Sequence, residues 1–139
     1  MYILKTECSI DAAHFLAGYQ GKCGNIHGHR WKIQLRVFGE KLEENRQNCG
    51  MVVDFGILKA ELKEEAECFD HVFVVEKGTL KDTTVAALES EGFTLQWVEF
   101  RPTAENLAQY FYEAMEKRGY AVADVTIYET PNNCAVYEK

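Results

Sequence analysis

Two histidines of this chain are spaced so that both could bind one metal ion. His27 and His29 flank a glycine and lead into an alternating segment that continues to residue 37. In a β-strand the side chains at i and i+2 point to the same face, so the two imidazoles would lie side by side. Trp31 and Ile33 share their parity, which places the pair in a row that faces the core. Because a buried polar group without a partner costs about 1–3 kcal/mol, the pattern predicts either a shared metal ion or a polar cluster without an ion.

A third histidine ends another alternating segment. In residues 2–14 the even positions are mostly apolar, and His14 is the last of them. This pattern predicts a half-buried antiparallel strand, followed by a loop and a second strand that begins near His27. Such a hairpin would bring His14 beside His27 and His29. Three imidazoles with one open position are typical of a catalytic zinc site, although ligand type alone leaves nickel or iron open.

Three further sets of residues could do acid–base chemistry. Cys23 lies four residues before His27, so its thiol could act as a base or as a fourth zinc ligand. Asp70 directly precedes His71, and a neighbouring carboxylate can orient an imidazole, although this dipeptide is also common at helix ends. Glu129 follows a row of apolar residues at the end of a predicted strand.

Two helices are expected to position these residues. Asp54 is a suitable N-cap for a helix that ends near Cys68, and Thr103 is a suitable N-cap for a helix that stops at Gly119. Glu105 falls in the first turn of the second helix, where a carboxylate suits the helix dipole.

The expected elements follow the order strand-strand-helix-helix-strand-strand. The last two strands are predicted over residues 123–129 and 134–138. This order predicts an α+β domain, with a four-stranded antiparallel sheet and two main helices on one face. Residues 72–101 show no clear pattern. They could contain a short strand at 72–75, a helix at 80–90 and a strand at 93–100.

Length, composition and charge limit the classes of function. The 139 residues are 47% apolar, which predicts one domain over 1–139. We expect a cytoplasmic protein without a membrane segment, since there is no run of 18 apolar residues and no signal-like N-terminus. The five cysteines are then expected to be free thiols. A net charge of −7 argues against nucleic acid as a partner.

Together, these motifs resemble the 6-pyruvoyl-tetrahydropterin synthase family, and within it the 6-carboxytetrahydropterin synthase branch. The resemblance covers nearly the whole chain in the family's motif order, through residues 12–16, 23–29, 53–55, 69–71, 102–106 and 128–130. The three residues between Cys23 and His27 are similar to the carboxy branch. Residues 72–101 depart from the family because this stretch is longer than in its compact members.

The resemblance implies a tunnelling fold, in which sheets from three subunits join into a barrel. Two trimers would stack into a homohexamer with active sites between subunits. The implied reaction converts 7,8-dihydroneopterin triphosphate into 6-carboxy-5,6,7,8-tetrahydropterin, acetaldehyde and triphosphate, a step in queuosine biosynthesis. The implied cofactor is Zn²⁺ on His14, His27 and His29, where it would bind and acidify the hydroxyls of the substrate side chain.

The resemblance also implies a role for each remaining site residue. Cys23 would take the carbon-bound proton, and His71, oriented by Asp70, would relay it. Glu129 would anchor the pterin, whose amino group and ring N–H match a carboxylate. Glu105 is a candidate substrate contact as well as a helix-start residue.

Several alternatives stay open from the sequence. The product could be the pyruvoyl compound, with release of triphosphate only, or a hydroxymethyl pterin made by a side-chain aldolase. A different class of protein is a non-catalytic, zinc-stabilised binding module in which Cys23 closes the metal site. Lys22 and Arg30 are candidate cations for the triphosphate by position only.

Overall fold

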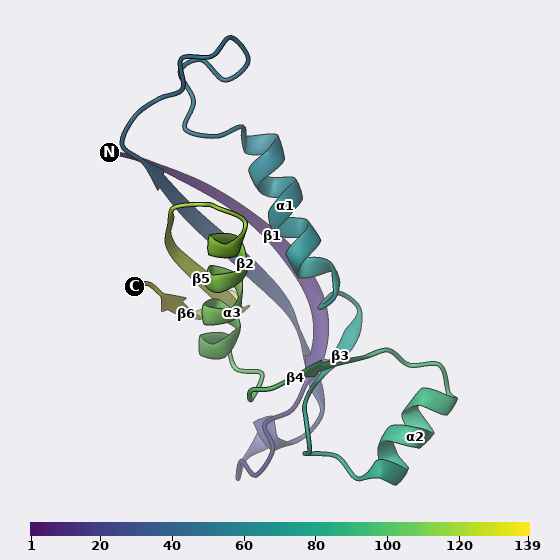
Figure 1. Ribbon diagram of the computed structural model, residues 1–139. Helices are drawn as coiled ribbons and strands as arrows, with labels where there is room; N and C mark the ends of the chain where they lie inside the picture. Colours follow the sequence, from purple (N-terminus) through teal and green to yellow (C-terminus); the bar gives the residue numbers. More distant parts are fainter.

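A computed structural model describes residues 1–139 and contains one six-stranded sheet and three α-helices (Figure 1). The strands are β1 (Tyr2–His14), β2 (His27–Gly39), β3 (Val72–Glu76), β4 (Leu95–Val98), β5 (Val122–Thr130) and β6 (Asn133–Tyr137). The helices are α1 (Phe55–Glu67), α2 (Asp82–Ser90) and α3 (Ala104–Lys117), with a 3-10 turn, η1 (Lys22–Gly24), between β1 and β2. The predicted α+β class is confirmed.

The prediction of a four-stranded antiparallel sheet is wrong in the number and direction of the strands, whereas the two main helices expected are α1 and α3. The sheet order is β4-β3-β1-β2-β5-β6, and β3 runs parallel to both β1 and β4. Parallel neighbours need a crossover, which α2 supplies between β3 and β4. These strands have only five and four residues, too few for a clear alternation, and α2 has no buried residue. The stretch therefore carries little of the periodicity on which the prediction relied.

The β1–β2 hairpin is the longest pairing in the molecule, and it matches the prediction. Its register runs from Tyr2 opposite Gly39 to His14 opposite His27. The buried positions are even in β1 from Thr6 onward and odd in β2 from Trp31 onward. These two rows share one face of the sheet, which we call the core face.

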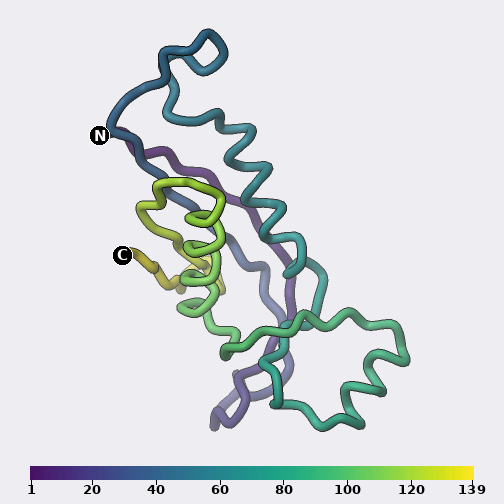
Figure 2. Tube along the Cα trace, viewed as in Figure 1, coloured from purple at the N-terminus to yellow at the C-terminus, as the bar shows by residue number.

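Helices α1 and α3 cover the core face, and their side chains join the strands in one hydrophobic cluster. Figure 2 shows both helices beside the long hairpin, whereas α2 projects away from it. The predicted N-caps are confirmed, since Asp54 accepts hydrogen bonds from the N–H groups of Gly56 and Ile57, and Thr103 accepts one from Asn106. None of the helices is long and apolar enough to cross a membrane.

Candidate active site

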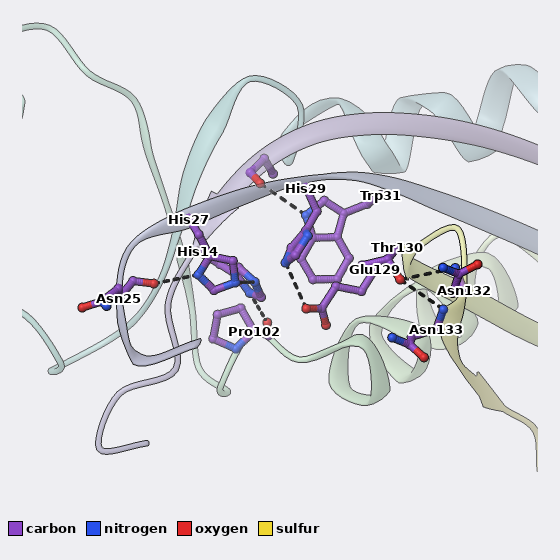
Figure 3. A network of polar contacts seen from close by, with 11 residues as sticks. His14, Asn25, His27, His29, Trp31, Pro102, Glu129, Thr130, Asn132 and Asn133 are labelled. Atoms are coloured by element: carbon purple, nitrogen blue, oxygen red, sulfur yellow. Dashed lines mark hydrogen bonds and ion pairs between the residues drawn. The ribbon is translucent and has the colours of Figure 1, made fainter. Parts of the chain in front are cut away.

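Three histidine side chains converge at the end of the β1–β2 hairpin (Figure 3). We call His14, His27 and His29 the histidine group. One ligand atom of each, together with a carboxylate oxygen of Glu129, lies within 4.8 Å of every other. His14 is 1% exposed, and the ring of Trp31 packs against it with 4.8 Å between centroids. The three imidazole rings therefore lie together, as the sequence predicts.

Backbone carbonyl groups fix which nitrogen carries the proton in two of these rings. Nδ1 of His14 lies 2.7 Å from the carbonyl oxygen of Pro102, and Nδ1 of His27 lies 2.7 Å from that of Asn25. Since a carbonyl oxygen only accepts hydrogen bonds, each Nδ1 donates, and in a neutral ring Nε2 then presents a lone pair. The two Nε2 atoms are 3.1 Å apart. Two lone pairs that face each other this closely favour a cation between them, and such carbonyl contacts are typical of metal-binding histidines.

The remaining two donors also face each other. Nε2 of His29 is buried and lies 2.9 Å from a carboxylate oxygen of Glu129. Burial lowers the pKa of His14 and of His29, which favours the neutral form that a metal ion requires. Three imidazole nitrogens and one carboxylate oxygen suit a divalent metal ion, with zinc bonds of about 2.0–2.2 Å. This donor set could therefore hold a metal ion.

Asp70 and His71 form an acid–base pair that is attached to β1. Nδ1 of His71 lies 2.9 Å from Oδ1 of Asp70. The same oxygen accepts a hydrogen bond from the N–H of Asp11 at 3.0 Å, and the N–H of His71 donates to the carbonyl oxygen of Asp11 at 2.6 Å. The hydrogen bond from Asp11 holds the pKa of Asp70 below its usual value. His71 has a φ of 56°, a rare backbone conformation for a histidine, and its side chain is 78% exposed.

The pair and the histidine group lie on opposite faces of the same strand. The carboxylate of Asp11 lies within 4.8 Å of both Asp70 and His71, and Asp11 has the opposite parity to His14 in β1. His71 borders an open cavity of about 630 Å³, which Phe93 and other residues of the β3–α2–β4 stretch also line. The acid–base pair thus contacts β1 on the face opposite to the side chain of His14, although His29 and His71 both line this cavity.

Cys23 and Glu105 lie outside the donor set of the histidine group. Cys23 is half-buried in η1, and the fourth donor of the group is the carboxylate of Glu129, not this thiol. Glu105 is exposed in the first turn of α3, three residues after Pro102, whose carbonyl oxygen contacts His14. The candidate phosphate contacts Lys22 and Arg30 are both exposed.

Sequence reasoning missed two contributions to these sites. It placed Glu129 at the pterin and not beside His29, although Glu129 shares the parity of the buried Ile127 in β5. It also missed Asp11, whose backbone fixes the acid–base pair, because nothing in a sequence signals a hydrogen bond between residues 59 positions apart.

Comparisons with known proteins agree with the fold. A family model for 6-pyruvoyl tetrahydropterin synthase matches residues 3–139. A 6-carboxy-5,6,7,8-tetrahydropterin synthase of Haemophilus influenzae is 30% identical over 145 residues and covers the whole of both chains. The enzyme of the same name from Rickettsia bellii is 32% identical over 128 residues, which is 88% of this chain and 89% of the relative.

Solved structures give the same result. An uncharacterised protein of Wolinella succinogenes has a TM-score of 0.79 at 19% identity, over 99% of this chain and 98% of its own. The 6-pyruvoyl tetrahydropterin synthase of Caenorhabditis elegans has a TM-score of 0.66 at 27% identity, over 100% of this chain and 97% of its own. The fold is thus that of these pterin synthases, and the chain belongs to the 6-pyruvoyl tetrahydropterin synthase family.

Proposed function

We propose that the protein is a zinc-dependent 6-carboxy-5,6,7,8-tetrahydropterin synthase. It would convert 7,8-dihydroneopterin triphosphate into 6-carboxytetrahydropterin, acetaldehyde and triphosphate in the cytoplasm, on the route to queuosine. The observation that supports this most is the histidine group, with its inward-facing nitrogen lone pairs, in a chain whose curated relatives carry that name. A bound zinc ion would supply Lewis acidity toward the hydroxyls of the substrate side chain.

The contacts of His71 suit it to moving a proton. In His71, Nδ1 donates to Asp70, so the neutral ring leaves Nε2 free to accept a proton at an exposed position. Cys23 would remove the carbon-bound proton as a thiolate, and His71 would relay it. Glu129 would bind the amino group and ring N–H of the pterin, and Glu105 would contribute a second substrate contact.

We infer that each site takes these residues from two copies of the chain. Because His71 and the histidine group lie on opposite faces of β1, a substrate at the histidine group of one copy would meet His71 of another. The molecule also exposes large apolar side chains, including Met51, Phe55 and Ile57, which a homohexamer could cover. We therefore propose active sites between subunits of a homohexamer.

Mixing two inactive variants tests this arrangement. His27→Ala removes one metal ligand and His71→Ala removes the relay, so each variant alone should be inactive. If each site takes the two groups from different copies, random assembly of equal amounts restores both to about a quarter of the sites. Acetaldehyde release should then reach about a quarter of the wild-type rate after co-refolding. No recovery from well-folded mixed oligomers would contradict a site shared between subunits, and a pyruvoyl product without acetaldehyde would contradict the proposed reaction.

A further inference from the structure

The geometry points to a second role for Glu129. We propose that its carboxylate is a fourth metal ligand in the substrate-free protein, and that it leaves the metal when the pterin ring of the substrate binds it. Recognition of the pterin would then open the position that the substrate hydroxyls occupy. The release half of this inference rests on the proposed function, whereas the ligand half does not.

Glu129 and His29 are close enough for both to bind one metal ion. Nε2 of His29 is buried and lies 2.9 Å from a carboxylate oxygen of Glu129, a contact without the alignment of a regular hydrogen bond. That oxygen also lies within 4.8 Å of the donor atoms of His14 and His27. Four donors gathered in this way would fill a tetrahedral zinc shell, whereas a catalytic zinc site needs an open position. One of the four must therefore be able to leave.

Among the four donor side chains, that of Glu129 has the fewest contacts to fix its position. His14 and His27 are each fixed through Nδ1 by a backbone carbonyl group, and the ring of His29 packs against Trp31 with 5.3 Å between centroids. The carboxylate of Glu129 has no backbone partner, its one close polar contact is with Nε2 of His29, and its side chain is 30% exposed.

The backbone around Glu129 also departs from the regular hydrogen-bonded pairing of β5 with β6. The pairing of β5 with β6 shifts register between Tyr128 and Thr130, so Glu129 occupies an irregularity of the kind that redirects side chains. Glu129 also borders an open cavity of about 440 Å³. Most of its lining, including Lys32 and Tyr128, lies on the sheet face opposite to the histidine side chains, so the cavity shows that this end of β5 is open to solvent.

The chemistry of a pterin explains why it would displace the metal bond. Its amino group and ring N–H form a fork that a carboxylate binds with two charge-assisted hydrogen bonds. A ligand shifts such an equilibrium only if it binds one state better. The pterin binds the carboxylate only when it is turned away from the metal, so pterin binding and opening of the metal site are coupled.

Cobalt(II) substitution tests both halves, because the visible absorption of Co²⁺ reports its donors and coordination number. The samples are the wild type, Glu129→Gln and the control Glu138→Gln, which removes an exposed carboxylate near the C-terminus. We expect Glu129→Gln to change the spectrum and to weaken cobalt binding by at least about tenfold in a chelator competition. The control should match the wild type. Circular dichroism establishes that each variant is folded.

Unsubstituted pterin then serves as a probe, since it offers the fork but has no side-chain hydroxyls. It should shift the wild-type cobalt spectrum toward that of Glu129→Gln and leave the variant unchanged. Equal cobalt affinity and equal spectra for the folded wild type and variant would overturn the ligand role. A wild-type spectrum that pterin leaves unchanged at saturation would overturn the release. Neither cobalt affinity nor the cobalt spectrum depends on acetaldehyde release. A failure of the proposed reaction can therefore be distinguished from a failure of the proposed role of Glu129.

Discussion

Replacing Asp70 should separate its structural role from its chemical one. Its Oδ1 accepts hydrogen bonds from the backbone N–H of Asp11 and from Nδ1 of His71. Asp70→Ala removes both and leaves the N–H of Asp11 without a partner. Asp70→Asn keeps an oxygen in place for Asp11 but loses the charge that orients and stabilises the imidazole of His71.

The expected loss of unfolding free energy follows from these contacts. A hydrogen bond to a charged group contributes about 1.5–3 kcal/mol. Because the side chain of Asp70 is 32% exposed, we take the lower half of that range. Asp70→Ala should then lower the free energy of unfolding by about 1.5–2 kcal/mol, and Asp70→Asn by less than about 1 kcal/mol. Both should lower turnover by about 100-fold or more if His71 relays a proton.

Urea unfolding followed by tryptophan fluorescence measures the stabilities, at one protein concentration because assembly shifts the midpoint. The control Glu67→Ala removes an exposed carboxylate at the end of α1 and should change neither stability nor turnover. If Asp70→Ala unfolds within about 0.5 kcal/mol of the wild type, the reasoning about the Asp11 contact is wrong. Equal destabilisation by alanine and asparagine would show that charge, and not the accepting oxygen, carries the effect.

Three further outcomes are expected. Burial and the hydrogen bond to Glu61 raise the pKa of Tyr120 to about 12. Since the folded-state pKa exceeds the usual value of about 10, this contribution to stability is complete below pH 10 and is lost as pH rises toward 12. Tyr120→Phe should therefore flatten the stability profile over that range. Gly24→Ala would place a Cβ 2.6 Å from the carbonyl oxygen of Tyr19, so it should displace the turn that carries Cys23, with a loss of about 1–3 kcal/mol in unfolding and reduced turnover. Removing metal with a chelator should lower the thermal midpoint, and zinc at 100 times its Kd should restore about 2.7 kcal/mol in the wild type but not in a variant of the histidine group.

Much of the scaffold could be predicted because its signals are local. Alternation over 13 residues identified each strand of the long hairpin, and parity alone placed His14 and His29 on the core face. Asp54 and Thr103 marked the helix starts because capping is a contact between near neighbours.

The place of the β3–α2–β4 stretch in the sheet could not be predicted on these grounds, although the sequence offered a strand, a helix and a strand at 72–75, 80–90 and 93–100. Its strands are short, and the parallel pairing of β3 to β1 and of β4 to β3 depends on residues far apart in the sequence. Helix α2 buries no side chain, so packing against the sheet does not fix its position. The same limit applies to Glu129, whose parity was visible but whose neighbour across the sheet was not.

Strand β1 links the two halves of the proposed chemistry within one rigid element. Asp11, which holds the acid–base pair through both of its backbone groups, and His14, which belongs to the histidine group, are three residues apart on opposite faces. Their relative position is fixed by a paired strand and not by a loop, so it is the same in every copy of the chain. In an assembly with sites between subunits, each β1 would therefore serve two sites, one through each face. A single well-formed strand would then set the spacing between metal and relay throughout the oligomer, provided that the subunits pack in one register.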